Sequence, residues 1–553
     1  MLRPIKDFFI LQILKKNKTQ LQFLLLFLMF FFSVLQVYTE PVLFNVCFLS
    51  FFAFVWFLLA IKRQVIFTLY FFLVFSPGCL HFVYQLIFRH PIDDASIEQV
   101  FISNIAISFA FLKSHPILLC CIPLILLLFV LFSHISHLIA SLQISSSKYI
   151  RFLSTLMLLW LIVFLLFSHG SIYRVVFDGY LSYKADCAFV ADIVEKKLNT
   201  TFSNVKISED QTVIVVIGES ETRTMLSLYG YQKDTTPHLS DLKDKLIVFS
   251  DVFSPHSHTA TVLDKALSLK SFSDTPNNFG SVIDLFSQAG FEVWWLSTPP
   301  LRDVWSGSTM AILSNAAHHK FFLNKGISWD RHDIDLLPKI KEAILQPTPK
   351  KLIFVHLLGS HGAYTDRYPE SLRRLDLTPY ENTIYSTDYF MNEIINFLEK
   401  ENIKNTKLLY FSDHGDAPQC QCHTEALGYP EMFEVPFYLW LSPDIRNKFK
   451  LNKDMLTKPY NTEHLIHSIA DLAKISSDEI DIQKSIFNQN RRGLYIMLDG
   501  KKYAISSDLI FEVSHPITRG KVVDFSEHYL KIKWYSSGEI ETWENKNSIW
   551  QKI

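Results

Sequence analysis

The chain has 553 residues, of which 49% are apolar, 48 are phenylalanine and only 19% are charged. This length is too great for one ordinary domain, and so apolar a composition is typical of a membrane protein with a soluble part. The formal net charge of −1 excludes a global basic field of the kind that attracts nucleic acid.

The first part of the chain contains five long apolar runs. A helix needs about 20 residues to span a hydrocarbon core of about 30 Å, and each run is of that order. The runs are too long and too nearly free of charge for buried helices of a soluble core, and their repetition does not fit a cleavable signal peptide. We therefore predict five membrane spans, at about residues 21–38, 41–61, 65–88, 116–142 and 149–169.

Lysine and arginine indicate how these spans are oriented. They gather in the N-terminal segment, around residues 62–63 and around residues 148–151. With five spans these segments lie on one side of the membrane, and the positive-inside rule makes that side cytoplasmic. Everything after about residue 169 is therefore expected outside the cytoplasm.

From residue 212 to about residue 476, short apolar strands alternate with helical patterns. This alternation predicts a mostly parallel sheet that is covered on both faces. The predicted strands are residues 212–217, 246–250, 291–297, 351–357, 407–412 and 435–441. The predicted helices are residues 261–269, 278–289, 333–345, 382–399 and 462–473.

The pattern changes to short β segments from about residue 490. These segments are residues 494–498, 502–506, 522–525, 529–534 and 539–543, and they predict a small β-rich extension. The predicted division of the chain is a transmembrane domain (1–170), a membrane-surface connector (171–210), an α/β catalytic domain (211–485) and the C-terminal extension (486–553).

Two predicted strands end in acidic residues. Strand 212–217 runs into Gly-Glu-Ser with Glu219, and strand 407–412 runs into Asp413 and His414. Asp-His-Gly also occurs in ordinary turns, but the carboxyl ends of parallel strands meet at one edge of a sheet. Carboxylate oxygen and imidazole nitrogen are zinc ligands, so the three residues are candidates for a metal site.

Threonine and histidine residues add to this pattern. Thr259 and Thr261 lie at the start of a predicted helix, where backbone N–H groups and the helix dipole favour a phosphoryl group, although a plain N-cap is the simpler interpretation. Three histidines also follow strands, namely His356, His361 in a Gly-Ser-His-Gly motif, and His423.

Three cysteines lie outside the predicted spans: Cys187, Cys420 and Cys422. In an oxidising compartment two of them can form a disulfide, but three thiols cannot all pair within one chain. The run Cys-Gln-Cys-His at 420–423 is alternatively a soft metal-binding patch.

The order of these motifs resembles that of the phosphoethanolamine transferases of the alkaline phosphatase and sulfatase superfamily. The five-span anchor and the outward domain match as well, so the resemblance covers about residues 20–475. It implies a multi-pass protein of the bacterial inner membrane, in which a five-helix bundle precedes a periplasmic α/β domain of the sulfatase type. No cysteines flank the Thr-headed helix, which places the chain closer to the branches that act on lipopolysaccharide core or periplasmic glucans than to the lipid A branch.

The resemblance also implies roles for single residues. Glu219, Thr259, Asp413 and His414 would be zinc ligands, with Thr259 also the nucleophile. Thr261 competes for that role, but the Ala-Leu-Ser at 266–268 follows Thr259 at the spacing that the superfamily shows. The remaining histidines would bind the donor phosphate or a second zinc ion: His356, His361 and His423.

The implied reaction moves phosphoethanolamine from phosphatidylethanolamine to lipopolysaccharide core, lipid A or a periplasmic glucan through a covalent phospho-threonine intermediate. One alternative resembles lipoteichoic acid synthase and moves glycerol phosphate from phosphatidylglycerol. Hydrolysis by a sulfatase or phosphatase is a second, although the Cys/Ser-x-Pro-x-Arg pattern of sulfatases is missing at Thr259. A non-catalytic membrane sensor that keeps the fold is a third.

Overall fold

The structure is a computed structural model. It describes residues 174–181, 202–206, 209–269, 280–300, 317–324, 331–419 and 428–553, with a few single positions before residue 185. The chain divides into one unit of Met1–Ser103 with Leu112–Ala185 and a second of Asn104–Phe111 with Asp186–Ile553. The five predicted spans lie almost wholly outside the described residues. Within the described ranges no helix combines the length and the apolarity that a membrane crossing needs.

The second unit is built on a seven-stranded sheet with the order β2-β8-β7-β1-β6-β4-β5. Its strands are β1 (Gln211–Gly218), β2 (Leu246–Phe249), β4 (Glu292–Ser297), β5 (His319–Phe322), β6 (Lys350–His356), β7 (Thr406–Ser412) and β8 (Phe437–Leu441). The central strand β1 is parallel to both neighbours, and β4 and β5 continue the parallel arrangement. The two antiparallel pairings both involve β8, with β7 on one side and β2 on the other, so the sheet is mostly parallel, as predicted.

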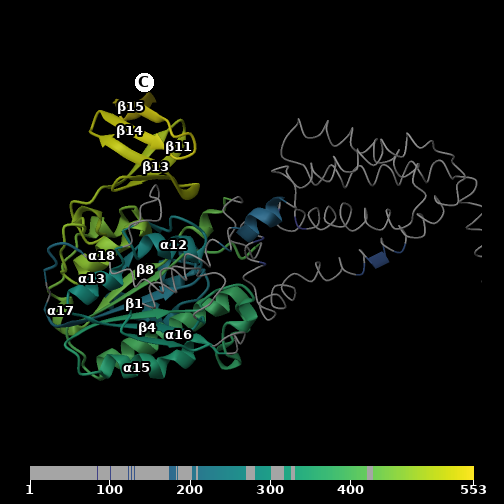
Figure 1. The fold of residues 1–553 in the computed structure, drawn as a ribbon, viewed down its shortest axis with the longest axis vertical. Coiled ribbons are helices and arrows are strands. Elements are labelled where there is room, and N and C mark those ends of the chain that lie inside the picture. Colours follow the sequence, from purple (N-terminus) through teal and green to yellow (C-terminus); the bar gives the residue numbers. More distant parts are fainter. Residues whose placement is uncertain are drawn as a thin grey trace, which may run out of the picture. The chain divides into compact units, whose positions relative to one another are not determined.

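Helices cover both faces of this sheet. One apolar core contains Val213 and Val215 of β1 and packs beneath α12, α13 and α18, whereas the other contains Ile214 and Val216 and packs beneath α15 and α16. Figure 1 shows α13 and α18 on one side of the strands and α15 and α16 on the other. These helices are α12 (Thr259–Ala266), α13 (Val282–Gln288), α15 (Leu337–Leu345), α16 (Pro379–Lys400) and α18 (Leu465–Leu472). Because both faces are buried, β1 is continuously apolar rather than alternating.

The predicted elements of this domain are present, with small shifts of their ends. The helix predicted at 333–345 is a 3-10 turn, η5 (Asp333–Leu336), followed by α15. Helix α16 starts three residues earlier than predicted, at Pro379, where Thr378 and Glu381 form a capping box. The edge strand β5 was not predicted, because its four residues His-Lys-Phe-Phe carry no strand-like alternation.

Residues 493–552 form a second, antiparallel sheet of seven strands, here called the β module. Its strands are β10 (Gly493–Leu498), β11 (Lys501–Ser506), β12 (Leu509–Glu512), β13 (His515–Phe525), β14 (Tyr529–Trp534), β15 (Ile540–Lys546) and β16 (Ile549–Lys552). Its core includes Ile505, Ile510, Ile532 and Trp543. Each of the five predicted β segments corresponds to one of these strands, the last beginning one residue before β15, whereas β12 and β16 were not predicted.

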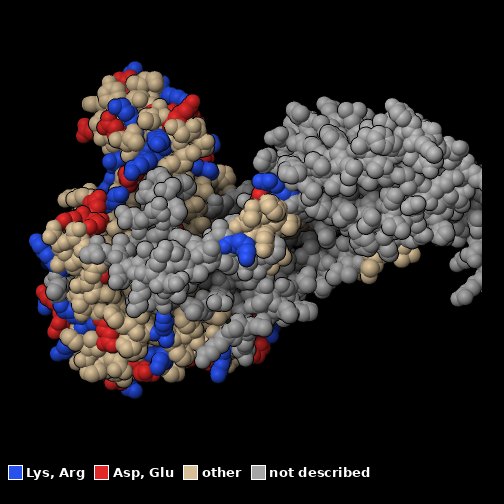
Figure 2. Space-filling view, in the orientation of Figure 1, with Lys and Arg blue, Asp and Glu red and all other residues tan. Residues whose placement is uncertain are grey.

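Charged side chains of both signs are spread over the described surface. On the face drawn in Figure 2, lysine and arginine alternate with aspartate and glutamate without forming one large patch of either sign. This distribution agrees with the near-zero net charge of the sequence.

Candidate active site

The register of the sheet brings the two acidic strand ends together. Gly218 of β1 lies opposite Ser412 of β7, so the next residues, Glu219 and Asp413, leave the sheet at the same edge. The backbone N–H of Asp413 donates to the Gly218 carbonyl at 3.0 Å. Both carboxylates are buried, with Glu219 only 4% exposed and Asp413 fully covered.

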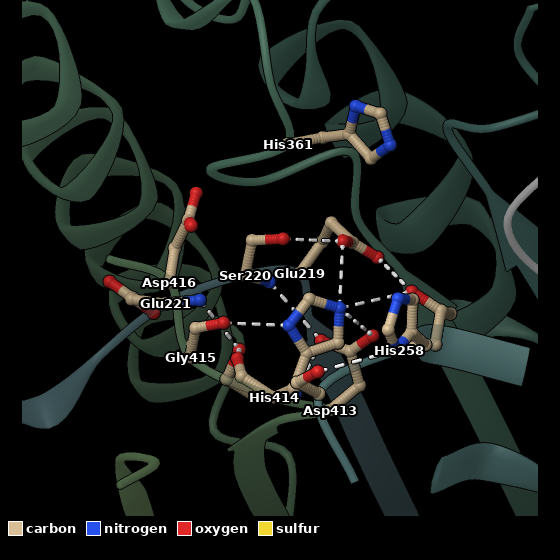
Figure 3. Close-up of polar contacts among 12 residues, drawn as sticks. Glu219, Ser220, Glu221, His258, His361, Asp413, His414, Gly415 and Asp416 are labelled. Atoms are coloured by element: carbon tan, nitrogen blue, oxygen red, sulfur yellow. Dashed lines mark hydrogen bonds and ion pairs between the residues drawn. The ribbon is translucent and has the colours of Figure 1, made fainter. Parts of the chain in front are cut away.

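Glu219, Asp413 and His414 form a compact cluster. Each offers one ligand atom, and these atoms all lie within 4.8 Å of one another. The Nε2 atom of His414 is 3.5 Å from Glu219 Oε1 and 3.5 Å from Asp413 Oδ2 (Figure 3). The other ring nitrogen, Nδ1, lies 2.7 Å from the Gly415 carbonyl and must donate its proton there. Nε2 therefore lies toward the two carboxylates, and a ring held by a backbone carbonyl through its other nitrogen is the usual arrangement of a histidine metal ligand.

These donors fit a divalent metal ion. Asp413 Oδ2 is buried and has no hydrogen-bond partner among the described residues. Two carboxylates that are buried side by side repel each other, and a bound cation would offset this cost. Carboxylate oxygens with one imidazole nitrogen are a common donor set for zinc.

Thr259 joins this cluster from the first residue of α12. Its hydroxyl oxygen lies 2.9 Å from Glu219 Oε2 and 3.4 Å from His414 Nε2. The residue is 2% exposed. Thr261, by contrast, is exposed, and its hydroxyl donates to the His258 carbonyl at 2.9 Å. Of the two candidate threonines, only Thr259 contacts the acidic residues.

Two of the three other candidate histidines are described. His356, at the end of β6, is buried, and burial lowers its pKa to about 4 against the opposing charge of Asp413. Burial and, to a smaller extent, the charges of Arg367 and His414 lower the pKa of His361 to about 3. Both rings are therefore neutral at pH 7. Figure 3 shows His361 set apart from the carboxylates.

His423 lies outside the described residues. The same holds for the three cysteines outside the predicted spans, Cys187, Cys420 and Cys422, so neither the disulfide nor the soft metal patch is tested.

Ser220 ties the two carboxylates to each other, a role that the motif did not reveal. Its hydroxyl donates to Glu219 Oε1 at 2.7 Å, and its backbone N–H donates to Asp413 Oδ1 at 3.2 Å. Its φ of 56° is uncommon for a residue other than glycine. The Tyr380 hydroxyl donates to the Ser220 carbonyl at 2.8 Å and holds this conformation. No local sequence signal indicates the positive φ.

Asp333 fixes the loop after β6, which also packs on Glu219. Its two carboxylate oxygens accept the backbone N–H groups of Leu358 at 2.8 Å and Gly359 at 2.9 Å. Gly359 has a φ of +47°, and a Cβ atom there would lie 2.8 Å from the Glu219 carbonyl oxygen. Only glycine fits this close approach. The sequence pattern predicted only that a helix starts at Asp333. The contact with Leu358 was not predicted, because a contact between residues 25 positions apart leaves no local pattern.

A buried polar network lies behind the cluster. The hydroxyl of Ser412 donates to the His414 carbonyl at 2.8 Å and accepts the backbone N–H of Glu221 at 3.0 Å. The Tyr410 hydroxyl contacts Glu221, whose pKa burial raises to about 8, although this hydrogen bond opposes the shift. These bonds fix the backbone on either side of the candidate ligands.

Comparison with known proteins identifies relatives of this domain. Residues 211–475 match the family model described as Sulfatase. The chain is 29% identical over 320 residues to the phosphoethanolamine transferase EptC of Escherichia coli (strain K12), covering 52% of this chain and 55% of EptC. It is 31% identical over 314 residues to the phosphoethanolamine transferase CptA of Salmonella typhimurium (strain LT2), covering 50% of this chain and 53% of CptA. The chain thus spans about half the length of the curated relatives that it matches.

One solved structure has a similar fold over a larger part of the chain. It is the integral membrane protein lipooligosaccharide phosphoethanolamine transferase A (EptA) from Neisseria meningitidis, with a TM-score of 0.53 and 18% identity, covering 83% of this chain and 95% of that chain. At this identity the likeness shows a shared fold. Together with the sequence matches, it confirms the resemblance expected from the order of the motifs.

Proposed function

Because residues 211–475 form a sulfatase-family domain similar to that of phosphoethanolamine transferases, we propose that this protein transfers phosphoethanolamine. The donor would be phosphatidylethanolamine, and the acceptor a cell-envelope glycolipid or glycan: lipopolysaccharide core, lipid A or a periplasmic glucan. The observation that carries the proposal is the contact of the Thr259 hydroxyl with Glu219 Oε2 beside His414. A buried hydroxyl among acidic residues and an imidazole is arranged for covalent phosphoryl transfer.

We further propose that Glu219, Asp413 and His414 hold zinc together with Thr259. The support is the donor set, the burial of the Glu219 and Asp413 carboxylates and the direction of His414 Nε2 toward both of them. When bound, zinc would favour the alkoxide form of the threonine and offset charge on the phosphoryl oxygens.

Thr259 would form the first new bond. Its Oγ1 would attack the phosphorus of the donor, the bond from phosphorus to the diacylglycerol oxygen would break, and diacylglycerol would leave with a proton. An acceptor oxygen would then attack the phosphorus and break the bond to Thr259, and the acceptor proton would restore the threonine hydroxyl. The first turn of α12 points its N–H groups and positive dipole end toward this position.

His356 and His361 would bind the donor phosphate or a second metal ion, and His423 is proposed for the same role. Because burial keeps His356 and His361 uncharged, they would act as hydrogen-bond donors or as metal ligands rather than as cations.

The anchor and the location of the protein are part of the same proposal. Five spans in residues 1–170, a surface connector in 171–210 and a periplasmic catalytic domain in 211–485, followed by 486–553, would bring a lipid donor to the membrane face of the enzyme. The apolar runs and the lysine and arginine bias of the sequence support this arrangement.

Donor choice tests the proposal against its rivals. Purified full-length protein with zinc would be incubated separately with phosphatidylethanolamine and phosphatidylglycerol, and diacylglycerol release and the mass of the protein would be recorded. Phosphoethanolamine on the protein supports the proposal, and glycerol phosphate on the protein supports the teichoic-acid alternative. Release of diacylglycerol and free phosphoethanolamine without transfer to any offered acceptor would indicate a hydrolase.

A further inference from the structure

We infer that the β module, residues 493–552, positions the candidate active site. It contacts residues 251–253, which lead to Thr259 and pair with the turn after Glu219, and residues 428–432, which bond to the residue after His414. The role of the site rests on the proposed function, whereas the contacts themselves do not. The Sulfatase family match does not include this module, since it ends at residue 475.

The first contact reaches the segment that leads to Thr259. Phe511 of β12 packs on Phe253, with ring centroids 4.8 Å apart and an interplanar angle of 56°. Both rings are buried, and Ala504 completes this small core. Phe253 ends the short strand β3 (Val252–Phe253), and only the loop of residues 254–258 separates it from Thr259. The position of β3 therefore limits where α12 can begin.

The second contact is also with the stretch before Thr259, at Asp251, and is linked through Arg223 to the turn after Glu219. The hydroxyl of Tyr495 in β10 donates to Asp251 Oδ2 at 2.7 Å. Asp251 lies 3.6 Å from the guanidinium of Arg223, which also pairs with Glu434 at 3.0 Å. Arg223 follows Glu219 by only four positions. The Tyr495 hydroxyl is thus linked through Asp251 to Arg223, in the turn that follows the candidate ligand Glu219.

The third contact reaches the segment that packs on the residue after His414. His515 Nδ1 donates to the Gly428 carbonyl at 2.6 Å, and Ile517 packs against the buried cluster of Ala417, Met432 and Phe433. The Met432 carbonyl in turn accepts the backbone N–H of Gly415 at 2.8 Å.

The segments around Arg223, Phe253 and Met432 are joined to one another by backbone hydrogen bonds. The backbone N–H of Ser254 donates to the Phe433 carbonyl at 2.9 Å, and the N–H of Arg223 donates to the Glu434 carbonyl at 3.0 Å. A shift of the β module would therefore move the segments together rather than one at a time. Packed interfaces of this kind transmit displacement because they are close-packed and deform little.

The experiment uses the full-length protein in detergent and three variants. Phe511→Leu keeps an apolar side chain but removes the ring contact with Phe253. Tyr495→Phe removes only the hydroxyl that reaches Asp251. Tyr529→Phe makes the same chemical change at an exposed tyrosine of the β module, 45% exposed, and is the matched control. Zinc affinity is measured by calorimetry, the cobalt(II) absorption spectrum reports the geometry of the site, and hydrogen exchange is followed in peptides covering residues 219–225, 252–260 and 410–418.

We expect Phe511→Leu and Tyr495→Phe each to weaken zinc binding by at least about 5-fold, which is the lower end of the range for coupled sites. Both variants should also change the cobalt absorption spectrum and speed hydrogen exchange in the three peptides. Tyr529→Phe should match the wild type in every readout. Unchanged affinity, spectrum and exchange in both variants, with the exchange protection of β13 and β14 intact, would overturn the inference. If Phe511→Leu unfolds the module, Tyr495→Phe decides alone.

Failure of the proposed function would look different. If the wild-type protein bound no zinc, the metal proposal would fail, while hydrogen exchange in the three peptides would still decide whether the β module positions them.

Discussion

The hydroxyl oxygen of Thr259 lies 2.9 Å from Oε2 of Glu219, although the two residues are 40 positions apart and come from different elements. Glu219 follows the central strand β1, whereas Thr259 begins α12. Their contact assembles a candidate nucleophile and a candidate metal ligand at the carboxyl edge of a parallel sheet, where such folds bind ligands.

Replacement of the candidate nucleophile should abolish the reaction without removing the metal. In Thr259→Ala the two carboxylates and His414 remain, so we expect zinc to bind while transfer from phosphatidylethanolamine falls at least about 10³-fold. Thr261→Ala is the matched control. The Thr261 hydroxyl donates to the His258 carbonyl at an exposed position, so activity should change little. A Thr259→Ala variant with full activity would move the nucleophile elsewhere.

Removal of the proposed zinc ion should destabilise the domain, because the buried carboxylates of Glu219 and Asp413 then lose its positive charge. At a zinc concentration about 1,000 times the dissociation constant, binding contributes about 4 kcal/mol to the free energy of unfolding. We therefore expect chelation to lower the thermal midpoint of the wild-type protein, and added zinc to restore it.

Asp413→Asn tests the physical cause of that effect. It removes one of the two charges and a candidate ligand, so chelator and zinc should shift its thermal midpoint much less than that of the wild type. Equal shifts in both proteins would mean that Asp413 takes no part in metal binding.

Gly359→Ala should damage the site through the backbone alone. The left-handed φ of +47° and the approach of a new Cβ to the Glu219 carbonyl at 2.8 Å both oppose the change. We expect a loss of about 1–3 kcal/mol in the free energy of unfolding, measured by denaturant titration, together with weaker zinc binding. Gly362→Ala is the control in the same loop, because its Cβ would meet nothing within 4 Å. Equal effects of the two changes would contradict the role given to Gly359.

The β module should lose stability in acid through Asp508. Burial opposes ionisation of this carboxyl, but the hydrogen bond and charge of His464 and the charges of Lys484 and Lys521 outweigh it and lower the pKa well below its usual range. The folded pKa is depressed, so the stabilising contribution is full above the unfolded pKa of about 3.9 and is lost as pH falls through the folded value.

Asp508→Asn provides the measurement. The free energy of unfolding of this variant should lie below that of the wild type at pH 7, and the difference should shrink as the pH is lowered below about 4. A difference that stayed constant with pH would show that the charge of Asp508 contributes nothing.

The sequence predicted the parts of the fold and the site that follow from local pattern. Apolar runs and helical spacing located the strands and helices of the sheet, and the acidic ends of β1 and β7 could be placed at one edge because parallel strands share an orientation. Glu219, Asp413 and His414 could be proposed on that basis, and the resemblance to the phosphoethanolamine transferases added Thr259. The structure brings these four residues together.

Contacts between residues far apart in the chain could not be predicted from the sequence. Asp333 meets its loop over 25 positions, and the β module reaches the site through Tyr495, Phe511 and His515 at far larger separations. The positive φ of Ser220 is likewise imposed by its tertiary partners rather than by its residue type. Burial also keeps His356 and His361 neutral, which no motif could indicate.

The central claim is a covalent phosphoethanolamine intermediate on Thr259. Its most direct test is the mass of the peptide containing Thr259 after the full-length protein has been incubated with phosphatidylethanolamine and zinc and quenched in acid. We predict a mass gain of one phosphoethanolamine group, mapped to Thr259, with release of diacylglycerol. An unmodified peptide together with no diacylglycerol would contradict the claim.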